Sequence, residues 1–271
     1  MKGGVARKRF GQHFLEPAWV DKVLRIIAPQ PHDTFLEIGP GRGALTRALA
    51  ASARQVVAFE IDRDLASALR ETAPPNLTIE EGDFLNVTVD RIRALVGDVA
   101  PVRVAGNLPY NVASPILFTL TDLYGTGLPF ADATVMLQRE VADRLAATPG
   151  TREYGVLTVL IGRRAKVERV LALPPGAFRP APRVRSSLVR LLFHPPQPPA
   201  INESVFQAMV QAVFTRRRKT LANALRAFPA PNGLSPADAL AEARIEGIRR
   251  PETLNMEELV RLADALVPET R

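Results

Sequence analysis

A turn-forming tetrapeptide, Asn107-Leu108-Pro109-Tyr110, follows a predicted strand over 102–106. The side-chain oxygen of Asn107 and the main-chain oxygen of Leu108 are acceptors that could hold the two hydrogens of an exocyclic amine. Pro109 sets the turn without adding an N–H donor, and Tyr110 offers a flat face on which a base can stack. Such an arrangement would aim the lone pair of an adenine N6 amine at a methyl donor. The competing interpretation is an ordinary Asn-Pro turn beside a core tyrosine.

Three alternate glycines, Gly39, Gly41 and Gly43, separate a predicted strand from a predicted helix over 44–51. Glycine lets a ligand touch the backbone, because a Cβ would hold the ligand away. The spacing G-x-G-x-G differs from the G-x-G-x-x-G pattern of dinucleotide-binding proteins. The loop therefore favours a different nucleotide-like ligand, although a tight turn alone would also use these glycines.

Two acidic residues follow the next two predicted strands. Glu60 ends the first of them, at the position that grips ribose hydroxyls in nucleotide-binding sheets, and Asp83 follows the second. Because parallel strands end at one edge of a sheet, Gly39, Glu60 and Asp83 predict a site for an adenosine-containing ligand at that edge. The alternative interpretation is that both acids are solvated loop carboxylates.

Short apolar runs alternate with helical patterns along most of the chain, as is typical of βαβ units around a parallel sheet covered on both faces. The expected parallel strands are 34–39, 55–61, 77–80, 102–106 and 133–138. Two later runs, 167–173 and 187–193, are separated by a segment too short and proline-rich for a helix. They predict an antiparallel pair at one edge of the sheet. The fold class is therefore α/β.

A proline-rich segment over 194–200 divides the chain, because such a backbone cannot join a helix or a central strand. Beyond it, apolar residues recur at helical spacing and predict a small all-α domain. The expected domains are 1–194 and 200–271. The run Arg216-Arg217-Arg218-Lys219 spans more than one helical turn, so we expect a helix break near Thr215, with this threonine capping the next helix.

The net charge of +7 is unevenly distributed, since residues 163–219 carry +10 and residues 1–11 carry +4. Clustered cations favour nucleic-acid binding, because they release counterions from phosphates. The absence of cysteine excludes disulfides and thiolate metal sites, and we expect no metal. No secretory signal and no bilayer-spanning stretch is recognisable, so we expect a cytoplasmic protein that does not contact a membrane.

Four motifs occur in order: 11–15 (GQHFL), 37–41 (EIGPG), 107–110 (NLPY) and 178–182 (FRPAP). Together they resemble the small-subunit (16S) ribosomal RNA adenine N6,N6-dimethyltransferase family, the KsgA type. The resemblance implies a Rossmann-like S-adenosylmethionine-dependent methyltransferase domain with a helical tail. It also implies dimethylation of two adjacent adenosines in a hairpin loop near the 3′ end of small-subunit rRNA during ribosome biogenesis. The expected partner is this rRNA within an immature 30S particle, and the expected oligomeric state is a monomer.

The resemblance also assigns roles to single residues. It implies that S-adenosylmethionine is held by His13, Leu15, Gly39, Glu60, Asp83 and Asn107. The implied catalytic set is Asn107, Leu108, Pro109, Tyr110 and Phe178, with Phe178 as the second stacking face for the target base. The family often has Asn where His13 stands. The cations expected to contact RNA are Arg179, Arg183, Arg185, Arg216, Arg217, Arg218 and Lys219.

Two other functions remain open. A sister class dimethylates one adenine of large-subunit (23S) rRNA and confers macrolide resistance, but it typically has Ile where Leu108 stands. A non-catalytic RNA-binding assembly factor could keep the same fold. An intact Asn107-Leu108-Pro109-Tyr110 tetrapeptide argues against lost catalysis.

Overall fold

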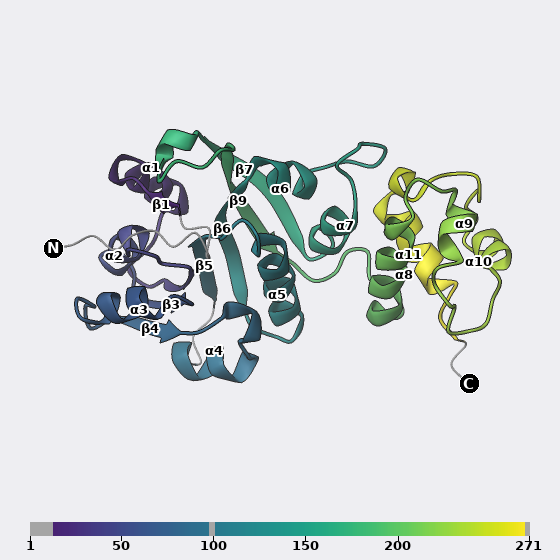
Figure 1. Cartoon of the computed structure of the whole chain (residues 1–271). Coiled ribbons are helices and arrows are strands. Elements are labelled where there is room, and N and C mark those ends of the chain that lie inside the picture. Colours follow the sequence, from purple (N-terminus) through teal and green to yellow (C-terminus); the bar gives the residue numbers. More distant parts are fainter. Residues whose placement is uncertain (1–12, 98–100, 269–271) are drawn as a thin grey trace. The chain divides into compact units, whose positions relative to one another are not determined.

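The structure is a computed structural model that describes residues 13–97 and 101–268. The chain forms two compact units, of which the first contains residues up to 142 together with 165–193, and the second contains 143–164 and the residues from 194 (Figure 1). The expected domain boundaries assigned 143–164 to the first domain. The structure groups this segment with the helical unit instead, because Tyr154 and Val159 belong to the core of that unit.

The first unit is built on a seven-stranded sheet. In spatial order its strands are β4 (Leu77–Glu81), β3 (Gln55–Glu60), β2 (Thr34–Ile38), β5 (Val102–Asn107), β6 (Phe130–Gln138), β9 (Ser186–Phe193) and β7 (Ala165–Leu173). The first five are parallel, whereas β9 pairs antiparallel with both β6 and β7. The α/β fold and the antiparallel edge pair are therefore confirmed.

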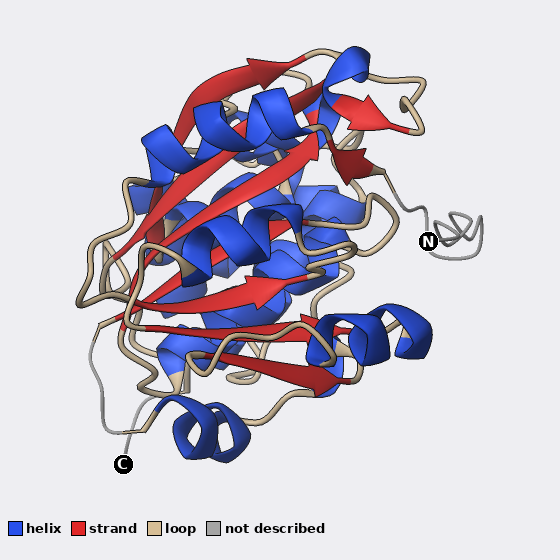
Figure 2. Ribbon diagram, turned by 90° about the vertical axis from the view of Figure 1, so that its left-hand side faces the viewer, coloured by secondary structure: helices blue, strands red, loops and turns tan. Residues whose placement is uncertain are grey.

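Helices cover both faces of this sheet (Figure 2). They are α1 (Pro17–Ile27), α2 (Ala44–Ala50), α3 (Arg63–Arg70), α4 (Val89–Val96), α5 (Ala113–Gly125) and α6 (Arg139–Leu145), the last of which runs into the second unit. Strand β2 is buried along its whole length, as expected of a central parallel strand. The four strands that lead to Gly39, Glu60, Asp83 and Asn107 thus belong to one sheet.

A second, two-stranded sheet brings the N-terminal segment to the loop between β7 and β9. Strand β1 (Phe14–Leu15) pairs antiparallel with β8 (Phe178–Arg179), so that Phe14 faces Arg179 and Leu15 faces Phe178. Glu16 extends the pairing, because its N–H donates to the Ala177 oxygen at 2.9 Å. We call residues 13–16 the N-terminal strap.

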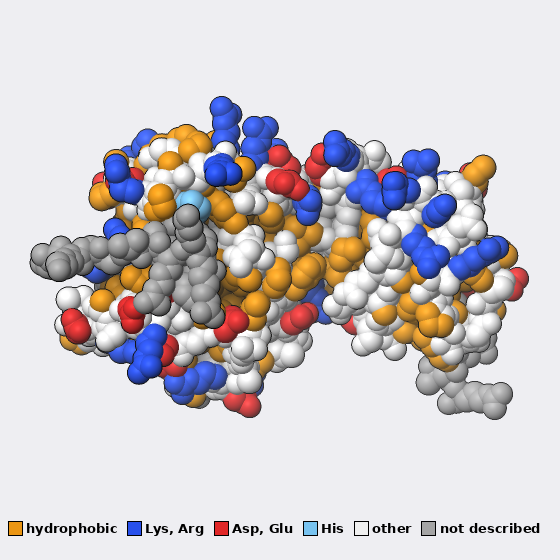
Figure 3. All heavy atoms as spheres, viewed as in Figure 1, with side chains coloured by type: hydrophobic (Ala, Val, Ile, Leu, Met, Phe, Trp, Pro, Cys, Tyr) orange, Lys and Arg blue, Asp and Glu red, His pale blue; other side chains and the backbone are white. Residues whose placement is uncertain are grey.

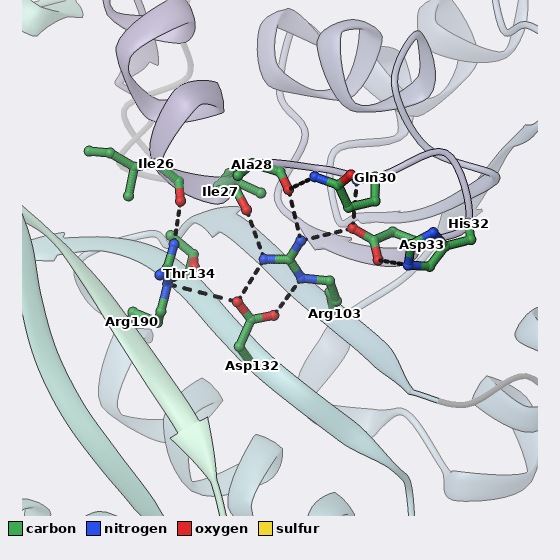
Figure 4. A network of polar contacts seen from close by, with 10 residues as sticks. All are labelled: Ile26, Ile27, Ala28, Gln30, His32, Asp33, Arg103, Asp132, Thr134 and Arg190. Atoms are coloured by element: carbon green, nitrogen blue, oxygen red, sulfur yellow. Dashed lines mark hydrogen bonds and ion pairs between the residues drawn. The ribbon is translucent and has the colours of Figure 1, made fainter.

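A largely buried polar network anchors the other end of α1 (Figure 4). Arg103, near the start of β5, binds Asp132 through Nε at 2.8 Å and Asp33 through Nη1 at 2.8 Å. Its Nη2 also donates to the Ile27 oxygen at 2.8 Å, and Arg190 donates to the Ile26 oxygen. These guanidinium groups satisfy carbonyls that a helix leaves unpaired at its C-terminus. The network therefore fixes α1, and with it the strap, against the sheet.

The second unit is helical and has its own hydrophobic core. Its helices are α7 (Val156–Gly162), α8 (Glu203–Thr215), α9 (Leu221–Leu225), α10 (Pro236–Glu242) and α11 (Met256–Asp264). Asn202, Ser235 and Asn255 cap three of them through side-chain oxygens. The break after α8 occurs where the cationic run predicted it. The prediction that Thr215 caps the next helix was wrong. Thr215 is the last residue of α8, and its hydroxyl donates to the Ala212 oxygen at 2.7 Å. The N-cap residue of α9 is Thr220.

Within the described ranges, no helix is both long and apolar enough to cross a bilayer.

Candidate nucleoside and methyl-donor site

A cavity of about 490 Å³ opens at the carboxyl ends of β2, β3, β4 and β5. This volume suits a nucleoside-sized ligand. The cavity brings together every predicted donor-site residue and the whole Asn107-to-Tyr110 tetrapeptide, while the strap contributes part of its wall. The predicted residues that line it are His13, Leu15, Gly39, Glu60, Asp83, Asn107, Leu108, Pro109, Tyr110 and Arg179. Gly11 and Gln12 of the N-terminal motif lie outside the described residues.

The glycine loop needs its glycines for backbone conformation. Gly39, Gly41 and Gly43 have φ angles of 69°, 59° and 75°, in the left-handed region that other residues rarely adopt. A Cβ on Gly41 would also lie 3.0 Å from the Phe14 ring of the strap. A side chain at Gly41 would therefore collide with the strap, and both the loop and the strap line the cavity.

Glu60 is held at the cavity wall by backbone donors. The Gly41 N–H donates to its Oε2 and the Asp62 N–H to its Oε1, both at 2.9 Å. As a residue, Glu60 is only 4% exposed. Burial raises the pKa of Glu60, and the backbone hydrogen bonds partly oppose this rise. Because each carboxylate oxygen keeps a free lone pair, Glu60 can still accept hydrogen bonds from two hydroxyl groups.

Glu37 is a second acidic residue at the cavity, and it was missed as a site residue in the sequence. It lies in β2 just before the glycine loop, lines the cavity, and is 1% exposed. Its Oε2 has no hydrogen-bond partner among the described residues. Burial raises the pKa of Glu37 to about 8, the neighbouring Glu60 adds to the rise, and Thr46 and Arg47 oppose it. The signal in the sequence was a charged residue between Leu36 and Ile38 in a strand predicted to be buried.

Asn107 is oriented by the strap. Its Nδ2 donates to the main-chain oxygen of His13 at 2.6 Å. An amide whose nitrogen is engaged in this way presents Oδ1 as its remaining acceptor. The Leu108 N–H donates to the Met136 oxygen at 3.2 Å, which holds the peptide between Asn107 and Leu108 against β6. Of the two acceptors inferred from the sequence, Asn107 Oδ1 is thus fixed in direction by the backbone of the strap.

The two predicted stacking residues differ in position. Tyr110 lines the cavity, its hydroxyl lies 2.7 Å from the Ser186 hydroxyl, and its ring stacks with His13 at a centroid distance of 5.4 Å. Phe178 is 3% exposed in the core and is absent from the cavity wall. Tyr110 therefore lies at the cavity, whereas Phe178 lies in the hydrophobic core.

Polar contacts close the strap onto the loop after β8. The Nε of Arg179 pairs with a Glu16 carboxylate oxygen at 2.7 Å, and the Nδ1 of His13 lies 2.7 Å from the Pro180 oxygen. A carbonyl oxygen accepts only, so Nδ1 carries the proton in this contact. The strap, the β8 loop and Asn107 thus form a single hydrogen-bonded assembly.

The predicted RNA-binding cations fall into two sets. Arg179, Arg183 and Arg185 are exposed in the unit that holds the cavity. In the helical unit, Arg216, Arg218 and Lys219 are exposed, whereas Arg217 is partly buried and donates to the Arg152 oxygen at 2.8 Å. In Figure 3, the visible face of the helical unit carries more Lys and Arg side chains than Asp and Glu side chains.

Comparison with known proteins identifies close relatives. The family model described as ribosomal RNA adenine dimethylase matches residues 4–262. The Ribosomal RNA small subunit methyltransferase A of Pseudomonas fluorescens is 42% identical over 270 residues, covering 98% of this chain and 96% of the relative. The protein of the same name from Aromatoleum aromaticum is 46% identical over 224 residues, covering 82% and 81%.

Two solved structures share the fold. A dimethyladenosine transferase from Plasmodium falciparum aligns with a TM-score of 0.71 at 24% identity, covering 92% of this chain and 96% of that one. The 23S rRNA methyltransferase ErmE aligns with a TM-score of 0.63 at 28% identity, covering 93% and 99%.

Proposed function

Because the chain belongs to the ribosomal RNA adenine dimethylase family, we propose that it dimethylates the N6 atoms of two adjacent adenosines in a hairpin loop near the 3′ end of small-subunit rRNA. The methyl donor in this proposal is S-adenosylmethionine. The observation that carries it is the hydrogen bond from Asn107 to the strap, which leaves Oδ1 as an acceptor in a nucleoside-sized cavity.

The residues of the cavity fit the methyl donor. The glycine loop leaves backbone free for close approach, and Glu60 has two oxygens for ribose hydroxyls. Asp83 would accept from the adenine amine, and His13 and Leu15 supply strap contacts. Bound there, S-adenosylmethionine would supply an electrophilic methyl group. The residues of this chain would orient the target amine, stack on the base and exclude water.

The target adenosine must leave its stack before its amine can reach this cavity. Asn107 Oδ1 and the Leu108 oxygen then accept the two amine hydrogens, which favours a pyramidal nitrogen with its lone pair directed at the methyl group. Tyr110 supplies a stacking face. Phe178 can serve as the second one only if its side chain leaves the core. Catalysis then rests on positioning and on exclusion of water, and the amine proton leaves to solvent once the nitrogen is methylated.

Two sets of cations support RNA binding, one in each unit. We propose that they contact phosphates of the rRNA within an immature 30S particle, and that the protein acts as a monomer in the cytoplasm. Phosphate contacts fix the position of the substrate, while the cavity selects the base.

Large-subunit RNA is the second candidate substrate, because ErmE shares the fold at 28% identity. The small subunit is favoured by the 42% identity to a Ribosomal RNA small subunit methyltransferase A. The test is transfer of labelled methyl groups to immature 30S particles and, separately, to 50S particles, followed by mapping of the labelled base. Label on two adjacent adenosines of small-subunit RNA is expected, and label on large-subunit RNA alone would overturn the proposal.

A further inference from the structure

We propose that Glu37 is the acid that loses its proton when the cationic methyl donor enters the cavity, so that donor binding releases one proton to solvent. The inference rests on the proposed use of S-adenosylmethionine. It concerns a residue that the proposed mechanism does not otherwise use.

The position of Glu37 is unusual for a carboxyl group. It lies in the central strand β2, is 1% exposed, and has an oxygen without a hydrogen-bond partner among the described residues. A buried carboxylate without a partner is costly, so the free protein keeps this group neutral. Burial raises its pKa to about 8, which places the neutral form in excess at pH 7.

The charges around Glu37 decide when it ionises. Across the sheet, β3 contributes Glu60, which opposes ionisation, while α2 contributes Arg47, which favours it. The other titratable or charged side chains at the cavity are His13, Glu16, Arg42, Asp83, Tyr110 and Arg179. S-adenosylmethionine carries a net positive charge, from a sulfonium and an ammonium group against one carboxylate. Adding that charge beside a buried neutral acid favours the ionised form of the acid.

The consequence is a linkage between donor binding and pH. If Glu37 is protonated in the free protein and ionised in the complex, donor affinity rises by up to tenfold per pH unit below pH 8 and levels off above it. The proton goes to the buffer, and no other reactant is needed.

Isothermal titration calorimetry tests this directly. Full-length protein is titrated with S-adenosylmethionine at pH 7.0 in buffers that differ in ionisation enthalpy, and the slope of the observed enthalpy gives the number of protons released. We expect the wild type to release about nine-tenths of a proton more than Glu37→Gln. Glutamine mimics the neutral acid and has no proton to lose. All other cavity groups are shared by the two proteins, so the difference reports Glu37 alone. Glu71→Gln, at an exposed position outside the cavity wall, should match the wild type.

Equal proton release by wild type and Glu37→Gln overturns the inference and leaves the proposed function standing. Failure of S-adenosylmethionine to bind at any pH between 6 and 9 overturns donor use itself, and the inference with it. Should Glu37→Gln not fold, the wild type alone decides. At pH 7.0 its release must be larger with S-adenosylmethionine than with S-adenosylhomocysteine, which has the same amino and carboxylate groups but lacks the sulfonium charge, and equal releases overturn the inference.

Discussion

The side-chain nitrogen of Asn107 lies 2.6 Å from the main-chain oxygen of His13, 94 residues earlier in the chain. This hydrogen bond joins the end of β5 to the N-terminal strap and leaves Oδ1 as the remaining acceptor of the amide. The same contact therefore connects the strap, which lines the cavity, to the side chain that we propose binds the target base.

Replacement of Asn107 by alanine removes one of the two acceptors for the target amine. Loss of a positioned polar group that acts on the reacting atoms typically costs about 10²- to 10³-fold in turnover, so kcat for RNA methylation should fall by this order. The RNA Kd should change little, because phosphate contacts dominate affinity. Asn111→Ala, at an exposed position on the same cavity wall, is the matched control and should retain turnover. Equal losses of turnover and RNA affinity in Asn107→Ala would contradict its assigned role.

Gly41→Ala should weaken donor binding. Backbone strain at this positive φ is one cause, and a collision with the strap is a second. The new Cβ would meet the Phe14 ring at 3.0 Å and displace the strap from the cavity wall. Gly150→Ala is the control, because Gly150 also has a positive φ but has no atom within 4 Å of its added Cβ. Calorimetric titration with S-adenosylmethionine should show weaker binding for Gly41→Ala only. A similar donor Kd for both variants would show that the strap does not form part of the donor site.

Arg103→Ala should strongly destabilise the protein. The substitution leaves Asp33 and Asp132 without their buried counter-ion and removes a cap from α1, and breaking a buried ion pair costs about 3–5 kcal/mol. Urea unfolding followed by circular dichroism measures the change. Arg91→Ala breaks the pair with Glu80, in which the Arg91 side chain is about half exposed, and should cost less than about 1 kcal/mol. Comparable losses in the two variants would argue against the anchoring role of the network.

The exposed cations after α8 should contribute to RNA affinity through phosphate contacts. The double variant Arg216→Ala/Arg218→Ala avoids Arg217, whose bond to the Arg152 oxygen makes its loss partly structural. Its RNA affinity should fall, and the slope of log affinity against log salt should flatten by about one to two units. The control Arg91→Ala/Arg93→Ala removes the same charge from α4. If the control flattened the slope equally, net charge rather than this segment would account for the binding.

In the ligand-free protein, the ionisation of Glu37 should make the free energy of unfolding depend on pH. Its folded-state pKa of about 8 lies above the ordinary value of 4.5, so between these values the folded state holds a proton that the unfolded state has lost. Stability from this group is therefore fully present below about pH 4.5 and is lost as pH rises through 8. The unfolding free energy of Glu37→Gln should fall less steeply across this window in urea titrations. If the unfolding free energies of the two proteins changed with pH in parallel, the Glu37 carboxyl would be solvated and not buried.

Local patterns in the sequence were sufficient for the architecture and for most of the cavity. Alternating strands and helices predicted the parallel sheet. Because parallel strands end at one edge of a sheet, the sequence also predicted that Gly39, Glu60, Asp83 and Asn107 lie together. Residue types alone also predicted two amine acceptors. The inferences about the sheet and the placement of the residues succeeded because hydrophobic periodicity and glycine conformation are local properties of the chain. The role of the two amine acceptors stays a prediction.

Other features depended on contacts between distant segments, which no local pattern encodes. Only the tertiary structure paired the strap with β8, enclosed Phe178 in the core, and turned Asn107 toward the His13 oxygen. It also revealed that Glu37 Oε2 has no hydrogen-bond partner in the described part of the chain, and that Arg103 joins Asp33, Asp132 and the end of α1. The physical reason is that burial and hydrogen-bond partners are properties of the packed chain. The sequence determined which chemical groups this protein has at the sheet edge, and packing decided which of them are solvated, paired or left without a partner.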